Sequence, residues 1–135
     1  MNVENALMPT PEQIKELTED AHDRPIYMVN LLKFKEKATY EDRREATLTG
    51  QEAYEIYIEE VAAHLEKVGG RPEIGGEVTG LRLGVVEDLW DMVAIAMYPN
   101  RKAMFTMMMD PDYRKSAEHR TAGLEGQLNI EIVLG

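Results

Sequence analysis

The sequence predicts a single α+β domain in which helices pack on one face of a four-stranded antiparallel sheet. Three observations predict this fold class. The chain has 135 residues, which suits one domain with one hydrophobic core. Segments with helical spacing alternate along it with short segments rich in β-branched and aromatic residues. Capping signals and glycines separate these segments, and no internal repeat or linker interrupts them.

The composition is that of an acidic chain, with 25 Asp and Glu against 15 Lys and Arg and a net charge of -10. Nucleic acids and anionic membranes both require a basic face, so neither is an expected partner. The absence of cysteine excludes disulfides, thiolate nucleophiles and zinc–thiolate sites. The first residues show no secretory signal, and no apolar run approaches the roughly 20 residues of a membrane span. We therefore expect a cytoplasmic protein.

The N-terminal part predicts a short helix followed by a strand. Thr10 fits an N-cap, Pro11 fits the first helical position, and Gln13 stands where a capping box requires it. These signals predict a helix over 10–22. The next segment, 26–35, reads IYMVNLLKFK and is apolar on both faces, which predicts a buried strand.

The middle of the chain predicts a loop, a long helix and an irregular strand. Residues 36–49 are polar and are expected to form a long loop. A helix begins after Thr49, which has Glu52 as its capping-box partner, and ends at the glycines near 70. The glycine-rich segment 71–88 follows, and we expect it to be an irregular strand with bulges.

The C-terminal part predicts a strand, an interrupted helix and a last strand. The segment 90–99 is apolar on both faces, like the first strand. A helical pattern follows it. Asp110 and Pro111 then restart the helix, which is expected to continue to Leu124. The segment 127–135 alternates apolar and polar residues and predicts the closing strand.

After the first helix, the predicted order is β-α-β-β-α-β, which is the split βαβ or ferredoxin-like plan. Its two main helices cover one face of the sheet, and the other face is normally polar. The first and third predicted strands are apolar on both faces, so the second face needs a cover. We expect a homodimer in which two sheets pack face to face. The alternative is that the short N-terminal helix covers that face.

Six segments carry a resemblance to a known family: TPEQIKEL, VNLLKFK, GQEAYEIY, VGGRPEIGGEV, WDMVAIAMYPNRKAM and DPDYRKSAEHRTAGLEG. Together they span nearly the whole chain. The chain resembles the bacterial domain-of-unknown-function family 1330, within the dimeric α+β barrel superfamily. This resemblance implies a ferredoxin-like protomer that pairs sheet to sheet.

The resemblance implies no reaction, because the family has none assigned. Related barrel families include cofactor-free monooxygenases, lactone isomerases and haem-handling proteins, but a shared fold does not determine function. Members of the family often have two histidines before the arginine of the last helix. Here Glu118 stands at the first of those positions, and only His119 precedes Arg120. A role that needs both imidazoles is therefore in question.

Arg120 is the most informative candidate for a binding residue. At helical spacing it shares a stripe with Tyr113, Ala117 and Leu124, and this stripe should face the sheet. A charged side chain on the buried side needs a partner. That partner is either a local acid in a structural ion pair or an anionic ligand, with Tyr113 beside it. His119 points away from the stripe and is expected at the rim or in solvent.

Tyr57 and His64 are the candidates for catalysis. They lie seven residues apart on one flank of the long helix, about 10 Å from each other, so both could line one cleft. His64 would act as a general base, and Tyr57 would donate a hydrogen bond to an enolate or oxyanion. The alternative is a helix margin, where such side chains bury their bodies and keep their tips in water.

Two further polar residues stand out. Asn30 lies in the middle of an apolar strand, where it either braces a loop or orients a ligand. Arg71 follows the long helix and either adds positive charge at a pocket mouth or caps helix carbonyls. The three histidines are scattered without metal-ligand spacing, so we expect no metal and no cofactor.

These residues support two hypotheses about function. The first is a homodimer that binds a small, anionic molecule at Arg120. If it is an enzyme, it would act without a cofactor on an activated carbon acid, as a monooxygenase or isomerase, with His64 as base and with Tyr57 and Asn30 at the oxyanion. The alternative is a non-enzymatic dimeric binding or interaction module with no catalytic site. The sequence names no substrate, and the surroundings of Arg120 distinguish the two hypotheses.

Overall fold

The structure is a computed structural model that describes residues 3–19 and 23–135. After α1, the elements follow the order β-α-β-β-α-β, with the last helical segment divided in two at Asp110. The predicted ferredoxin-like order is therefore confirmed. The last residues of the predicted helix 10–22 lie outside the described residues. The elements are α1 (Pro11–Glu19), β1 (Ile26–Phe34), α2 (Gly50–Lys67), β2 (Arg71–Glu77), β3 (Met92–Tyr98), α3 (Arg101–Met109), α4 (Pro111–Gly123) and β4 (Leu124–Ile132).

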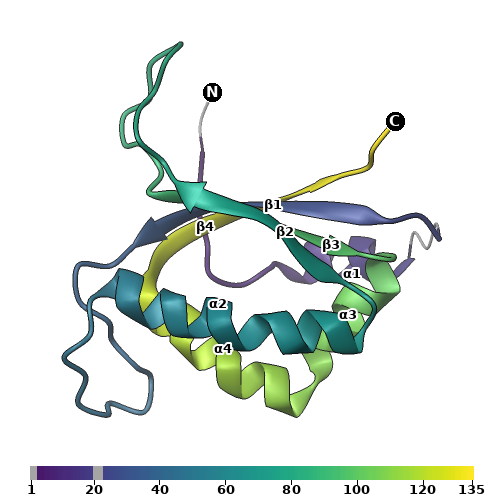
Figure 1. The fold of residues 1–135 in the computed structure, drawn as a ribbon, viewed down its shortest axis with the longest axis horizontal. Coiled ribbons are helices and arrows are strands. Elements are labelled where there is room, and N and C mark those ends of the chain that lie inside the picture. Colours follow the sequence, from purple (N-terminus) through teal and green to yellow (C-terminus); the bar gives the residue numbers. More distant parts are fainter. Residues whose placement is uncertain (1–2, 20–22) are drawn as a thin grey trace.

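The four strands form one antiparallel sheet in the order β2-β3-β1-β4. β1 lies at the centre, where Leu31 is paired with Val93 of β3 and with Leu128 of β4. This central position explains why β1 is apolar on both faces. Figure 1 shows α2, α3 and α4 beneath one face of the sheet, while no helix lies over the other face.

The hydrophobic core lies between the sheet and these helices. Alternate residues of β1 point toward the helices, and Ile26, Met28 and Leu32 are buried there. Two clusters of buried residues divide this layer. One contains Ile26, Met28, Leu65, Tyr98 and Met107, and the other contains Leu32, Tyr54, Tyr57 and Leu124.

The N-terminus of α2 and the C-terminus of α4 meet backbone to backbone. The predicted capping box opens α2, with the Thr49 side chain accepting from the Glu52 N–H and the Glu52 carboxylate accepting from the Thr49 N–H. A Cβ atom on Gly50 or on Gly123 would collide with the carbonyl oxygen of the other. Glycine at both positions therefore permits the close packing of α2 against α4.

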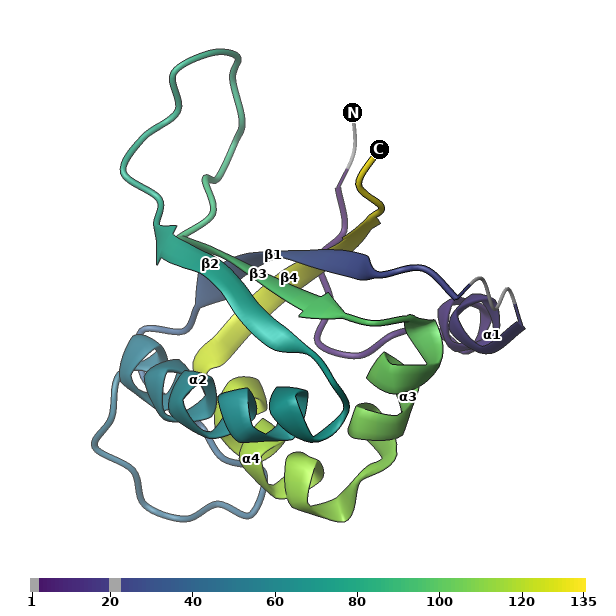
Figure 2. The ribbon, with the colours of Figure 1, turned by 45° about the vertical axis from the view of Figure 1, so that its right-hand side comes forward.

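The sheet face opposite the helices is apolar and uncovered. The side chains of Ile74, Ile130 and Ile132 on this face are 67%, 43% and 40% exposed. α1 packs beside α3 at one end of the sheet, and none of its residues is buried (Figure 2). The alternative in which the N-terminal helix covers this face is therefore wrong. We call this surface the open face.

The predicted irregular strand over 71–88 is wrong beyond Glu77. β2 has one register irregularity, between Pro72 and Ile74, and residues 78–91 then leave the sheet. This segment, which we call the arm, connects the paired strands β2 and β3, and its base is still held by a hydrogen bond from the Val78 N–H to the Asp91 carbonyl at 2.9 Å. Figures 1 and 2 show the arm projecting on the side away from the helices.

The predicted polar loop 36–49 contains no helix or strand, yet it is packed against the helices. The Thr39 N–H donates to the Ala122 carbonyl, and Ala38 and Tyr40 are buried against α2 and α4. At the other edge of the molecule, residues 3–9 run beside β4, where Ala6 forms a bridge with Gln127. Among the described residues, no helix has the length and apolar character that crossing a membrane requires.

Candidate functional site

Arg120 projects from the last part of α4 toward β4. Its Nη2 donates to the side-chain oxygen of Gln127 at 2.6 Å and to the Leu7 carbonyl at 2.8 Å, and its Nε donates to the same Gln127 oxygen at 3.1 Å. No carboxylate of a described residue lies within ion-pair distance of it, and its Nη1 donates to none of the described residues. The half-buried guanidinium is thus oriented by neutral oxygens that leave its charge uncompensated.

Asn30 fixes the orientation of this arrangement from the centre of the sheet. Its side-chain oxygen accepts from Gln127 Nε2 at 2.6 Å and from Asn129. Its own amide donates to the Ala94 carbonyl at 3.1 Å and to the Met28 carbonyl at 3.3 Å. Because the side-chain nitrogen of Gln127 donates to Asn30, the side-chain oxygen of Gln127 must face Arg120. Asn30 therefore braces three strands rather than a loop.

Four tyrosines converge between the helices and the sheet: Tyr54, Tyr57, Tyr98 and Tyr113. The hydroxyls of Tyr57 and Tyr113 are hydrogen-bonded to each other at 2.9 Å. Burial raises the pKa of Tyr57 well above the ordinary value, and Tyr113, Tyr54 and Tyr98 raise it further. Burial likewise raises the pKa of Tyr54 and of Tyr98. The four hydroxyls form what we call the tyrosine cluster.

Two hydroxyls of the tyrosine cluster have no partner among the described residues. The side chains of Tyr54 and Tyr98 are only 4% and 6% exposed, and neither hydroxyl forms a hydrogen bond with a described residue. Every described side-chain oxygen that is sealed from solvent has a hydrogen-bond partner. Because these two hydroxyls have none, each must keep some surface that a water-sized molecule can reach. Arg120 acts electrostatically on Tyr54, which places its charge near the cluster.

His64 lies outside this arrangement, in a second network between α2 and α4. Its Nε2 is hydrogen-bonded to Ser116 Oγ at 2.9 Å, and Ser116 donates to Glu60 at 2.7 Å. Because the serine proton goes to the carboxylate, we assign the bond with His64 as Nε2–H donating to the serine oxygen. His64 approaches the tyrosine cluster only by the edge-on contact of its ring with Tyr113, whose centroid is 5.8 Å away.

His119 lies at the rim of the helix layer, where both of its ring nitrogens lie near other side chains. Its Nδ1 is 2.6 Å from the Tyr40 hydroxyl, and its Nε2 is 3.7 Å from Glu60. Tyr40 comes from the loop 36–49, which has no periodic pattern, so sequence reasoning had no signal for this pair. Glu118, which directly precedes His119, forms an ion pair with Arg44 at 2.8 Å.

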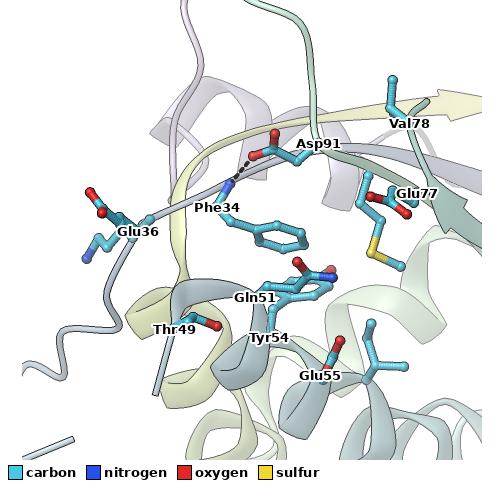
Figure 3. Close-up of a pocket in the computed structure, with 12 residues that line it drawn as sticks. Phe34, Glu36, Thr49, Gln51, Tyr54, Glu55, Glu77, Val78 and Asp91 are labelled. Atoms are coloured by element: carbon cyan, nitrogen blue, oxygen red, sulfur yellow. Dashed lines mark hydrogen bonds between the residues drawn. The ribbon is translucent and has the colours of Figure 1, made fainter. Parts of the chain in front are cut away.

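An open cleft of about 460 Å³ lies elsewhere, between the start of α2 and the ends of β1, β2 and β3. Figure 3 shows Phe34 and Tyr54 facing each other in it; their ring centroids are 5.6 Å apart. Glu55 and Glu77 line the same cleft. None of the site residues predicted from the sequence lines it. Sequence reasoning missed the cleft because these residues come from separate segments of the chain.

Arg71 is remote from the other candidates. It opens the edge strand β2 and forms an ion pair with Glu73, so it neither caps α2 nor joins Arg120. As for metals, the part of the chain that the structure describes holds no group of three or more His, Cys, Asp or Glu side chains that could ligate an ion. The structure therefore unites Arg120 with Asn30, and Tyr57 with Tyr113, and separates both pairs from Arg71.

The chain is similar in structure to several solved proteins. No family model and no curated protein matches the chain. The hydroxynitrile lyase from Passiflora edulis is 8% identical and superposes with a TM-score of 0.59, covering 84% of this chain and 96% of that protein. At this identity the likeness shows the ferredoxin-like fold alone.

A much closer similarity is found with RPA0582, a protein of unknown function from Rhodopseudomonas palustris. Its crystal structure is 30% identical to this chain, with a TM-score of 0.86 over 98% of both chains. The methylated form of RPA0582 is 32% identical, with a TM-score of 0.87 over 97% of this chain and 96% of that one. The chain described here thus belongs to the family of RPA0582, whose function is unknown.

Proposed function

We propose that the protein binds a small anionic molecule between the helix layer and the sheet, with Arg120 holding the anion. One observation carries this proposal: the half-buried guanidinium has no carboxylate partner among the described residues. A charge removed from water is costly unless a partner of opposite charge compensates it. Because Nε and Nη2 already donate to Gln127 and Leu7, the anion would be held by the N–H groups of Nη1, which donate to none of the described residues.

The tyrosine cluster supports a ligand rich in oxygen atoms. The hydroxyls of Tyr54 and Tyr98 are free of partners among the described residues, so they can donate to a carboxylate, an enolate or a phenolate. The paired hydroxyls of Tyr57 and Tyr113 add a third donor on the same side of the sheet. We therefore include Tyr57, Tyr113 and Asn30 among the residues that form or brace the site.

Catalysis on a carbon acid is a second candidate function, favoured by this group of hydroxyl donors, which would stabilise a developing oxyanion. The general base of that reaction would be His64. However, the Nε2 of His64 is bonded to Ser116, and its ring touches Tyr113 only edge-on. The geometry therefore favours binding over proton transfer. A binding or interaction module without any catalytic site is the remaining alternative.

We further propose that the protein is a homodimer joined through its open face, and that it belongs to family 1330. The uncovered isoleucines of β2 and β4 support the dimer, because exposed apolar surfaces of this kind mark sites of association. The six segments of the resemblance support the family assignment, since they extend from α1 into the start of β4.

The binding proposal is tested with a thermal-shift screen of small carboxylates, followed by calorimetry. The proteins compared are the wild type, Arg120→Met, Arg120→Lys and the control Arg44→Met. A ligand at a hundred times its Kd should add about 2.7 kcal/mol to the free energy of unfolding. We expect Arg120→Met to weaken binding at least tenfold, Arg120→Lys to weaken it less, and Arg44→Met to leave it unchanged.

Arg44 is a suitable control because it is paired with Asp42 and Glu118 at the surface. Carboxylates that bind Arg120→Met as tightly as the wild type would contradict the proposal. So would a wild type that binds no carboxylate while Arg120→Met merely unfolds earlier, because Arg120 would then be a structural residue. Arg120→Lys keeps the test informative if Arg120→Met does not fold.

A further inference from the structure

The first described residues contact the Arg120 site from the edge of the sheet. We call residues 3–9 the strap; they pass the edge of β4 and curve beneath the sheet to reach α1 (Figures 1 and 2). The Leu7 carbonyl accepts from Arg120 Nη2 at 2.8 Å. The Leu7 side chain packs against the buried cluster that contains Tyr54 and Tyr57. The strap therefore touches both the cationic and the aromatic part of the proposed site.

The Leu7 carbonyl occupies half of the guanidinium edge that a carboxylate needs. A guanidinium presents five N–H groups in a rigid planar fork. Nε and Nη2 of Arg120 donate to the same oxygen of Gln127, which uses the N–H of Nη2 that lies beside Nε. The other N–H of Nη2, which lies beside Nη1, is therefore the one that donates to Leu7. A carboxylate can form two parallel hydrogen bonds with Nη1 and Nη2 only after the Leu7 carbonyl has left.

Few contacts hold the strap to β4. Among the described residues, one backbone hydrogen bond joins them, from the Ala6 N–H to the Gln127 carbonyl at 3.1 Å. The Asn5 side chain lies against Gly126, where a Cβ would collide with it. A single bridge lacks the neighbouring hydrogen bonds of a ladder, so it opens more readily than the strands of the sheet. The strap can therefore separate from β4 while the sheet and the helices stay in place.

We propose that the strap is an autoinhibitory segment: its Leu7 carbonyl competes for Arg120, and a carboxylate that binds through both oxygens displaces it. This inference rests on the proposed anion site and adds how access to that site is regulated. The carboxylate replaces a neutral acceptor by a charged one, which forms the stronger hydrogen bond with a guanidinium. Because opening the strap costs its contacts with β4, the protein binds the carboxylate less tightly than a protein whose strap is already open.

A variant that loosens the strap tests the competition. Ala6→Pro removes the N–H that donates to Gln127 and leaves the Arg120 side chain unchanged. Glu4→Pro is the matched control, because Glu4 is exposed and its N–H has no partner among the described residues. Calorimetry with benzoate should give a Kd for Ala6→Pro that is at least about fivefold lower than that of the wild type. Glu4→Pro should bind benzoate as the wild type does.

Hydrogen exchange of the Ala6 N–H, followed by NMR, reports on the strap of the wild type directly. Benzoate should speed this exchange at least about threefold, because the bond with the Gln127 carbonyl is lost. The control is the Val78 N–H, which donates to the Asp91 carbonyl at the base of the arm and should keep its rate. Iodide has no second oxygen and can be held by Nη1 alone, so it should neither speed the exchange nor bind Ala6→Pro more tightly.

Three results would overturn the role of the strap: benzoate that binds folded Ala6→Pro no more tightly than the wild type, slower exchange of the Ala6 N–H with benzoate present, or no benzoate binding by any of these proteins. The exchange measurement uses the wild type, so it decides the question if Ala6→Pro does not fold. Arg120→Met should lose benzoate binding whether or not the strap competes. A failure of the anion site is therefore distinguishable from a failure of the strap.

Discussion

Single residues of the tyrosine cluster determine how this protein responds to alkaline pH. Burial raises the pKa of Tyr54, Tyr57 and Tyr98 in the folded chain, whereas an unfolded tyrosine ionises near pH ~10. The folded state therefore keeps these three protons at a pH where the unfolded chain releases them. Their contribution to stability is complete below the unfolded pKa and is lost as pH rises toward the folded values.

We predict that the free energy of unfolding falls steeply above pH 10. Each of the three tyrosines contributes a slope of at most about 1.4 kcal/mol per pH unit. Urea unfolding at a series of pH values measures this slope, and Tyr98→Phe should reduce it by one such contribution. Phenylalanine fits there because the Tyr98 hydroxyl has no partner among the described residues. Folded protein in which all tyrosines ionise near pH 10, followed by absorbance at 295 nm, would contradict the prediction.

At the scale of single residues, helical spacing predicted the direction in which some side chains point but not the residues that they contact. The stripe that contains Tyr113, Ala117 and Arg120 faces the core and the sheet, as its spacing of three and four residues indicates. The contact of His119 with Tyr40 could not be predicted, because it depends on how an aperiodic loop folds back. The cleft could not be predicted either, since Glu55 and Glu77 come from different elements.

Helices α2 and α4 are held together at the scale of elements by the close approach of two glycines. The carbonyl oxygens of Gly50 and Gly123 occupy the space that a Cβ on the other residue would need. Lys35 adds its own carbonyl to this contact, and Gly50 N–H donates to it at 3.1 Å. Backbone atoms cannot move aside as a flexible side chain can, so a larger residue must push the helices apart.

We predict that Gly123→Ala destabilises the protein by about 2–3 kcal/mol, within the usual cost of overpacking a close contact. The control is Gly76→Ala, because a Cβ on Gly76 in β2 meets no atom within 4 Å. That control should change the free energy of unfolding by less than about 1 kcal/mol. Chemical denaturation of both variants measures the difference. Equal stability of the two variants would show that the helix layer adapts at no cost.

Element prediction worked where a pattern was local and failed where pairing decided the outcome. The capping boxes and the restart at Asp110 depend on neighbouring residues, and the helices begin where these signals place them. The segment after Glu77 has strand-like residues such as Val85 and Val86, but the ladder between β2 and β3 ends at the Glu77–Met92 pair and the hydrogen bond of Val78 with Asp91. Strand formation depends on a partner that the local sequence does not contain.

At the scale of the whole molecule, two apolar surfaces lie on the same side. The open face carries exposed isoleucines, and the arm carries Leu83 and Val85, which are 90% and 100% exposed. Both lie on the side away from the helices (Figures 1 and 2). A two-fold dimer through the open face would bury the same patch on both protomers, so one contact would cover both open faces.

We predict that the protein sediments as a dimer and that Ile130→Glu converts it to a folded monomer. A charge at the centre of an apolar interface of standard size, about 800 Å² per partner, loses its hydration without gaining a counter-charge. Val85→Glu should weaken the dimer less, because the arm contributes only the margin. Ile14→Glu, on the exposed side of α1, is the control and should leave the mass unchanged. Sedimentation equilibrium measures all four proteins, and a wild type of monomer mass at micromolar concentration would refute the face-to-face dimer.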